Sequence, residues 1–188
     1  MKKVYVFLAE GFEEVEALTP VDVFRRGGVE VKTVSITDSL EVKGAHGVVV
    51  LADTTLGAAD CSDADLLLLP GGMPGAVNLN NCSPLKQLLA RHHGKGGKLA
   101  AICAAPLVFG GLGLLRGRRA TCYPGFEKYL EGATYTHELC TKDGNITTGE
   151  GPAASFLFAY TLLEELTDRA SVDAIAEGMM YKHLMVTK

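Results

Sequence analysis

The sequence of 188 residues contains no hydrophobic run as long as a membrane span, so we expect that it does not cross a bilayer. Its first apolar run, from Val4 to Ala9, is too short for a signal peptide, and acidic residues follow it closely, which predicts a cytoplasmic protein. Positive charge is not in excess either, because the net charge is −4 and the pI is near 5.7. Binding to nucleic acid or to an anionic membrane surface is therefore not expected.

Metal-binding and disulfide patterns are also absent from the sequence. No His, Asp or Glu spacing indicates a metal site, and the glycine-rich loop at 71–75 lacks the Gly-Lys-Ser/Thr ending of a nucleotide-binding P-loop. We therefore expect neither a metal nor a cofactor. The cysteines are odd in number and form no Cys-x-x-Cys pair, which predicts free thiols in a reducing compartment, one of them a candidate for reactivity: Cys61, Cys82, Cys103, Cys122 and Cys140.

Strand-like and helix-like segments alternate along the whole chain, with no internal repeat, low-complexity tract or linker. The unbroken apolar run Leu66–Leu69 is typical of a parallel strand that is covered on both faces. These patterns predict one α/β domain with a mostly parallel sheet. Strands are expected over 3–9, 29–36, 48–51, 63–69 and 97–102, with short ones near 123–124, 135–136 and 145–148. Helices are expected over 13–26, 83–94, 104–115, 152–166 and 170–181, with Ser83 as an N-cap.

Three loops leave the predicted carboxyl ends of strands, which is the edge where open parallel sheets bind ligands. They read AEGFEEVE, LPGGMPG and CAAP, and they supply carboxylates, unhindered backbone N–H groups and a thiol. Cys103 lies on a tight strand-to-helix turn between small residues, which is the geometry of a nucleophile elbow. A helix N-terminus there would lower the pKa of the thiol. Burial as a small hydrophobic residue is the alternative, but the position favours a reactive thiol.

The acidic cluster Glu13, Glu14 and Glu16 follows the first strand. One carboxyl turned into the crevice would be biased toward its protonated form, and could hydrogen-bond to the thiolate or act as a general acid and base. The residues themselves do not decide which carboxyl this is, but for Glu13 and Glu14 we expect solvated charge that complements the helix dipole. The N–H of Gly72, with the N–H after the cysteine, could form an oxyanion hole, whereas a simple turn is the alternative for the glycine pair.

Four sequence blocks resemble the ThiJ/PfpI superfamily, in the branch of the Parkinson disease protein (DJ-one) and its bacterial relatives. In chain order they read FLAEGFEEVEALTPVDVFRRGGVEV, LLLLPGGMPGAVNL, AAICAAPLVF and TTGEGPAASFLFA. The resemblance covers nearly the whole chain. It implies a single ThiJ/PfpI-like (class I glutamine amidotransferase-like) domain over 1–188, with the flavodoxin-like three-layer sandwich that places helices on both faces of the sheet. It also implies a homodimer that packs partly through the first helix.

The resemblance further implies a role for individual residues. Cys103 falls on the reactive, oxidation-prone cysteine of the family, and Glu16 falls on the carboxylate that hydrogen-bonds to it. Gly72 and Ala104 fall where backbone N–H groups face the sulfur. Tyr123 stands where this branch has a pocket histidine, and His46 where it has a pocket arginine. The residues expected to form the pocket are Gly71, Tyr123, His46 and Pro152.

Three functions are consistent with these residues. The first, implied by the resemblance, is a cofactor-independent enzyme that acts on reactive dicarbonyls or glycated adducts, as a glyoxalase or deglycase does, in stress protection. The second is a non-catalytic redox sensor or chaperone that works through oxidation of Cys103. The third is a PfpI-type cysteine peptidase or amidase. It is weakened because Ala104 stands where peptidase members carry a histidine, and Ala105 where amidotransferases need glycine.

Overall fold

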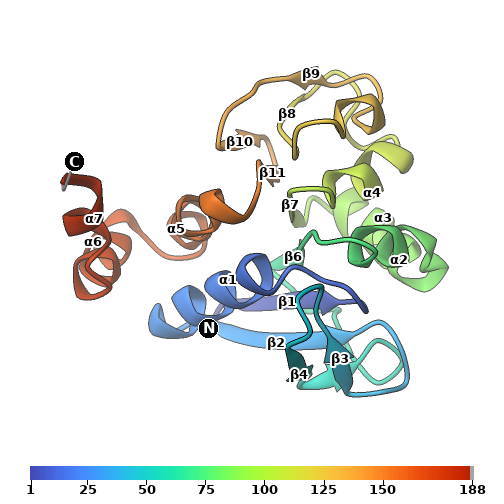
Figure 1. Ribbon diagram of the computed structural model, residues 1–188, viewed down its shortest axis with the longest axis horizontal. Coiled ribbons are helices and arrows are strands. Elements are labelled where there is room, and N and C mark those ends of the chain that lie inside the picture. The colour runs from blue at the N-terminus through green and yellow to red at the C-terminus, as the bar shows by residue number, and fades with distance from the viewer. Residues whose placement is uncertain (187–188) are drawn as a thin grey trace.

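A seven-stranded sheet crosses the middle of the protein, and helices pack around it in the computed structural model (Figure 1). The structure describes residues 1–186, so the last two residues of the predicted 1–188 domain lie outside the described residues. In chain order the elements, with η for a 3₁₀-helix, are β1 (Lys3–Leu8), α1 (Glu14–Arg26), β2 (Glu30–Ser35), β3 (Glu41–Lys43), β4 (Val49–Leu51), β5 (Thr54–Thr55), β6 (Leu66–Leu69), α2 (Gly75–Asn81), α3 (Ser83–Gly94), β7 (Lys98–Ile102), α4 (Pro106–Gly111), β8 (Arg119–Ala120), η1 (Glu127–Tyr129), β9 (Thr134–Tyr135), β10 (Cys140–Asp143), β11 (Ile146–Gly149), η2 (Pro152–Ala154), α5 (Ser155–Leu166), α6 (Arg169–Gly178) and α7 (Tyr181–Val186).

The strand order is β10-β11-β7-β6-β1-β2-β5, and every pair except β10–β11 is parallel. The chain crosses from β1 to β2 in one direction and from β6 to β7 in the other. Because such crossovers are right-handed, α1 and α3 lie on opposite faces of the sheet. α5 packs against α1, and α2 packs against α3 and α4. The predicted flavodoxin-like α/β sandwich is therefore confirmed, with its topological switch point between β1 and β6.

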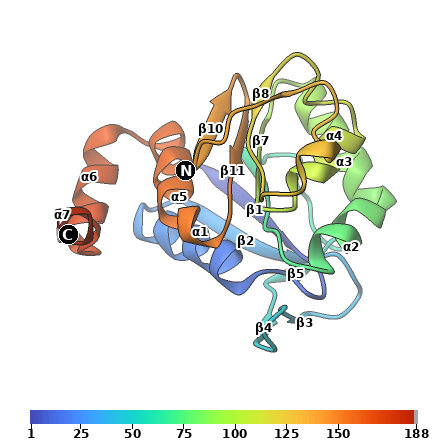
Figure 2. The same cartoon turned by 45° about the horizontal axis from the view of Figure 1, so that its top comes forward.

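The terminal helices and the small hairpin lie outside this sandwich. Both views show α6 and α7 beyond α5, on the side away from α2 and α3 (Figures 1 and 2). The hairpin β3–β4 forms a separate two-stranded sheet. Within residues 1–186, no helix is long and apolar enough to cross a membrane.

Burial explains why β6 and β1 occupy the centre of the sheet. All four leucines of Leu66–Leu69 are fully buried, and each such side chain contributes roughly 1.5–3 kcal/mol relative to exposure. On α1, Ala17, Val21 and Phe24 turn inward, and their spacing of three and four residues places them on one helical face. Leu18 on the same helix stays exposed, and the predicted homodimer would cover it.

Two predicted helices are shorter in the structure. The helix predicted over 104–115 is reduced to α4, because Gly113 adopts a left-handed φ of 71°, a conformation that ends helices. The helix predicted over 170–181 is interrupted at Met180, whose φ of 60° separates α6 from α7. Both breaks come from left-handed backbone conformations that hydrophobic periodicity does not reveal.

Several smaller predictions were also wrong. Residues 123–124 form a turn, and the nearest strand is β8. Ser83 is the first residue of α3, and Cys82 precedes it as the N-cap. The helix predicted over 152–166 begins as the short η2. Neither α2 nor β10 was predicted, because α2 has only seven residues and β10 is held by pairing with β11.

Candidate active site

Three neighbouring strands of the sheet end at one edge, and the candidate residues follow them directly. Cys103 comes immediately after β7, Gly71 and Gly72 follow β6, and Glu16 lies in the first turn of α1 after β1. A Cβ built on Gly71 would lie 2.7 Å from the Cβ of Cys103 and 2.7 Å from Oε2 of Glu16. The structure thus brings the thiol and the carboxyl together, and only glycine leaves the space between them free.

Cys103 lies in the left-handed region, with a φ of 65°. This conformation costs a non-glycine residue about 1–2 kcal/mol. Backbone contacts on both sides hold it: its N–H donates to the carbonyl of Gly149 at 2.9 Å, and its carbonyl accepts from the N–H of Tyr123 at 2.8 Å. The residue is 8% exposed, so small reagents can reach it. A strained turn of this kind is typical of a positioned nucleophile.

Glu16 is completely buried, and its two carboxyl oxygens have different surroundings. Oε2 accepts the N–H of Gly71 at 2.9 Å. Oε1 has no partner of hydrogen-bonding geometry among residues 1–186. Burial raises the pKa of Glu16 to about 7, although the Cys103 thiol and the Gly71 N–H both act to lower it. Glu16 is therefore the desolvated carboxyl of the acidic cluster.

The electrostatics of Cys103 differ from what the sequence predicts. Burial raises the pKa of its thiol, and the charge and hydrogen bond of Glu16 raise that pKa further. The N–H groups of Gly72 and Ala104 hydrogen-bond toward the sulfur and act in the opposite direction. The predicted lowering of the pKa by a helix dipole is wrong, because α4 begins only at Pro106 and has six residues. These contacts favour the neutral thiol at Cys103, and the Glu16 carboxylate is the neighbouring base for its proton.

His46 lies beside the other two acidic residues rather than in the crevice with the thiol. The backbone N–H of His46 donates to Oε1 of Glu14 at 2.8 Å. Its ring Nδ1 lies 2.9 Å from Oε2 of Glu14 and 3.6 Å from Oε1 of Glu13. The hydrogen bond to Glu14 raises the pKa of His46. Burial raises the pKa of Glu14, but hydrogen bonds from His46 and nearby backbone outweigh it and leave that pKa below its ordinary value.

This cluster corrects the expectation that Glu14 is merely solvated, because the residue is 8% exposed. The ligand atoms of Glu13, Glu14 and His46 all lie within 4.8 Å of one another, so these side chains could hold a metal ion. Sequence spacing did not reveal the group, because its members come from the start of α1 and from the turn of the β3–β4 hairpin. As it stands, the cluster is held together by the hydrogen bonds between His46 and Glu14.

Tyr123 and Pro152, both predicted to form the pocket, do line one hollow. It has a volume of about 270 Å³ and also contains Glu150 and Ala153. Tyr123 adjoins the site through its backbone bond to Cys103. We call this space the small hollow.

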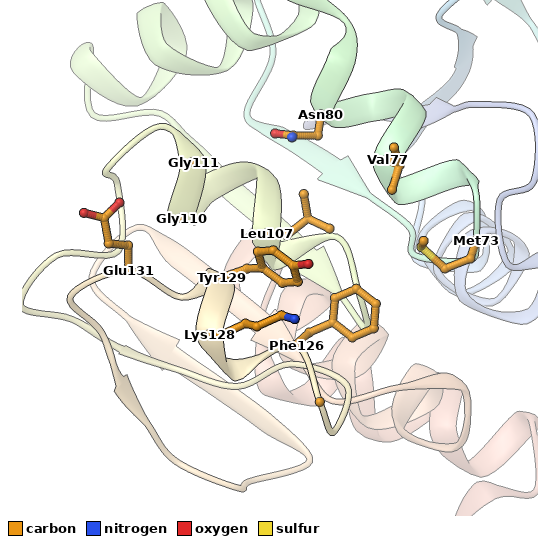
Figure 3. A pocket seen from close by; sticks show the side chains of 11 residues that line it. Met73, Val77, Asn80, Leu107, Gly110, Gly111, Phe126, Lys128, Tyr129 and Glu131 are labelled. Carbon is orange, nitrogen blue, oxygen red and sulfur yellow. The ribbon is translucent and has the colours of Figure 1, made fainter.

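Sequence reasoning missed a cavity with a volume of about 680 Å³ that lies between α2, α4 and η1 (Figure 3). We call it the side groove and define it by Met73, Val77, Asn80, Leu107, Gly110, Gly111, Gly125, Phe126, Lys128, Tyr129 and Glu131. No motif signals it, because three segments distant in sequence form its walls. Position along the chain could have indicated this cavity, since each of the three segments follows a candidate site residue in the sequence.

Comparison with known proteins gives consistent matches. A sequence model described as the DJ-1/PfpI family matches residues 2–165. Protein DJ-1 homolog B of Arabidopsis thaliana is 43% identical over 167 residues, which are 88% of this chain and 38% of that protein. The Parkinson disease protein 7 homolog of Danio rerio is 38% identical over 169 residues, 88% of this chain and 89% of that protein. The chain spans less than half the length of the two Arabidopsis relatives it matches.

Comparison with solved structures also finds similarity to DJ-1 proteins. Toxoplasma gondii DJ-1, in an oxidized form, superposes with a TM-score of 0.92 at 34% identity, covering 96% of this chain and 98% of that one. The similarity therefore extends over sequence and fold together.

Proposed function

The chain belongs to the DJ-1/PfpI family, and on that premise we propose that it converts reactive 2-oxoaldehydes into 2-hydroxy acids, with Cys103 as the nucleophile. The observation that supports this proposal is the buried Glu16 carboxyl, which interacts with the thiol and has a pKa of about 7. A group with this pKa can both accept and donate protons at neutral pH. The same chemistry extends to glycated adducts of these aldehydes.

The reaction begins when Glu16 accepts the thiol proton and the sulfur attacks the aldehyde carbon. A carbon–sulfur bond forms, and the aldehyde oxygen takes the proton to give a hemithioacetal. Glu16 then removes the hydrogen of this carbon as a proton and delivers a proton to the neighbouring carbonyl carbon. The hydroxyl proton of the hemithioacetal passes to the neighbouring carbonyl oxygen, so the first carbon is oxidised to a thioester and the second is reduced to an alcohol. Water hydrolyses the thioester, which releases the 2-hydroxy acid and restores the thiol.

Backbone groups contribute to the same steps. The N–H groups of Gly72 and Ala104, which hydrogen-bond toward the sulfur, would stabilise negative charge that develops on the adjacent oxygen. Oxyanion donors of this kind contribute roughly 10²–10³-fold each, and a general acid and base such as Glu16 contributes roughly 10²–10⁴-fold. The electrons move within the substrate, so the reaction consumes no oxidant or reductant.

The test is formation of lactate from methylglyoxal by the wild-type protein and by Cys103→Ala and Glu16→Gln. We expect turnover that is lost in Cys103→Ala and reduced roughly 10²–10⁴-fold in Glu16→Gln. Cys61→Ala is the matched control, because Cys61 is also buried but precedes β6, at the other edge of the sheet. Wild-type turnover no greater than that of Cys103→Ala would refute the proposal.

A redox role is the second candidate, favoured by the N–H groups that face the sulfur. These donors would stabilise a sulfinate, which forms when two molecules of hydrogen peroxide oxidise the thiol in succession and leave as water. The structurally similar Toxoplasma gondii protein is itself described as oxidized. Here we expect stoichiometric gain of two oxygen atoms by intact mass, with a shifted Tm and no turnover. Equal oxygen gain by Cys103→Ala would exclude this role.

A peptidase function lacks support from the predicted residues. The histidine expected in the pocket, His46, pairs with Glu14, and Ala104 follows the nucleophile.

A further inference from the structure

We propose that the side groove receives the carbon substituent of the 2-oxoaldehyde, and that the enzyme therefore prefers dicarbonyls with an aromatic substituent over methylglyoxal. This inference rests on the proposed function of Cys103, and it names the substrate class that the site selects.

The first argument is that the chain segments around Cys103 continue directly into the walls of the side groove. Met73 directly follows Gly72, whose N–H is bonded toward the sulfur. The N–H of Leu107 bonds to the carbonyl of Ala104 at 3.2 Å, so Leu107 lies one turn beyond the cysteine. On the third side, Phe126 bonds through its N–H to the carbonyl of Tyr123, at 3.0 Å. The side groove is thus walled by the continuations of three segments that contact Cys103.

The chemistry of the walls is the second argument. Met73, Val77 and Tyr129 are 50%, 36% and 45% exposed, so apolar side chains gather on an open surface. The rings of Phe126 and Tyr129 lie 5.7 Å apart at a tilt of 43°, and they lie across the groove from Val77 and Met73 (Figure 3). A planar aromatic substituent could pack against both rings in offset or edge-to-face geometry.

The positions of the charged residues in the groove, and the volume of the groove, limit the substituents that it can hold. The ammonium of Lys128 is held against the ring of Tyr129, 5.1 Å from its centroid. Glu131 lies at the end of the groove remote from Met73 (Figure 3). Met73 and Leu107, which follow the segments that contact Cys103, are both apolar. The volume of about 680 Å³ is also in the range that holds drug-sized ligands, whereas the methyl group of methylglyoxal would leave most of it unused.

The small hollow is the competing location for the substituent. It also adjoins Cys103 through Tyr123, but its volume is about 270 Å³ and Glu150 is part of its wall. A carboxylate beside an apolar ring is unfavourable, since its desolvation is not compensated. We therefore assign the substituent to the side groove, and the experiment includes a variant that fills the small hollow instead.

Gly111→Phe tests the assignment. Gly111 is exposed, and a Cβ built there meets only Oδ1 of Asn80, at an ordinary 3.5 Å, so a phenyl ring can enter the groove without breaking the fold. Gly94→Phe is the matched control, because its Cβ meets nothing within 4 Å and the residue ends α3, outside the groove lining. Ala153→Phe fills the small hollow, where Ala153 is exposed.

The first readout is the kcat/KM of each protein for phenylglyoxal and for methylglyoxal. Filling an apolar pocket typically changes the ratio of kcat/KM between two substrates by about 10- to 200-fold. We therefore expect the wild-type kcat/KM for phenylglyoxal to exceed that for methylglyoxal by about 10-fold or more. Gly111→Phe should remove most of that preference, because it should lower kcat/KM for phenylglyoxal far more than kcat/KM for methylglyoxal. Gly94→Phe should leave both values unchanged. A wild-type protein without preference, or selective loss in Ala153→Phe, would overturn the inference.

The second readout does not need turnover and separates the two proposals. Cys103 is alkylated by iodoacetanilide and, separately, by iodoacetamide; in both reactions a carbon–sulfur bond forms and iodide leaves. Each alkylation rate is divided by the rate at which the same reagent alkylates glutathione. We expect the aromatic reagent to be favoured in the wild type and not in Gly111→Phe. This result without any dicarbonyl turnover would retain the groove as an aromatic subsite and refute the proposed reaction. Equal normalised rates would refute the groove.

Discussion

The raised pKa of Glu16 predicts a measurable dependence of stability on pH. In the unfolded chain this carboxyl loses its proton near the ordinary value of 4.5, whereas in the folded protein its pKa is about 7. The folded state therefore binds one proton more than the unfolded state between these values, and stability falls as the pH rises through that window. At 1.36 kcal/mol for each pH unit, the full effect is about 3 kcal/mol.

Glu16→Gln removes this titration and keeps the shape of the side chain. We expect the stability of the wild type relative to Glu16→Gln to be constant below pH 4.5, to fall by about 3 kcal/mol between pH 4.5 and 7, and to level off above. Urea unfolding at a series of pH values measures both proteins, and their difference cancels the titration of other groups.

The experiment also has a matched control variant and a result that would contradict the prediction. Glu177→Gln changes a carboxyl that is 74% exposed in its side chain, and its difference from the wild type should vary little with pH. If the difference between the wild type and Glu16→Gln were equally flat, Glu16 would not be the desolvated carboxyl, and the reasoning on its proton transfer would fail with it.

Three further predictions concern the surroundings of the site. Gly71→Ala should cost about 1–3 kcal/mol in urea unfolding, because its Cβ would lie 2.7 Å from two side-chain atoms, whereas Gly94→Ala should be near neutral; equal stabilities would contradict the packing. Glu14→Gln should lower the pKa of His46 toward its ordinary 6.5, since the hydrogen bond to Glu14 is the main cause of its rise, and an unchanged NMR titration would refute that cause. Leu18→Glu should give a monomer by light scattering where the wild type gives a dimer, because it adds a charge to the exposed apolar side of α1; a monomeric wild type would refute the predicted homodimer.

The main lines of the fold could be predicted from local patterns. Leu66–Leu69 has no polar residue to present to water, which is typical of a covered strand, and the alternation of such runs with helical stripes predicted a mostly parallel sheet. Short elements escaped prediction because their stability is not local. Cys140–Asp143 is a strand only because it pairs with Ile146–Gly149, and Gly75–Asn81 is too short for a hydrophobic period to show.

The choice among the three carboxyls illustrates the same limit at the site. Glu13, Glu14 and Glu16 lie within one helical turn, where each residue is rotated by about 100° from the last, so they point in different directions. The packing of Ala17, Val21 and Phe24 sets the rotation of the helix. This rotation, which no residue of the cluster encodes, turns Glu16 toward the thiol.

By itself the sequence determined that a thiol follows a buried strand at a ligand-binding edge, since hydrophobic runs and small residues at a turn are local properties of the chain. Tertiary structure alone decided the proton chemistry and the shape of the site. The raised pKa of Glu16 comes from burial, and burial is a sum over segments distant in sequence. The side groove exists because α2 and η1 both pack against α4, and no segment read alone contains that space.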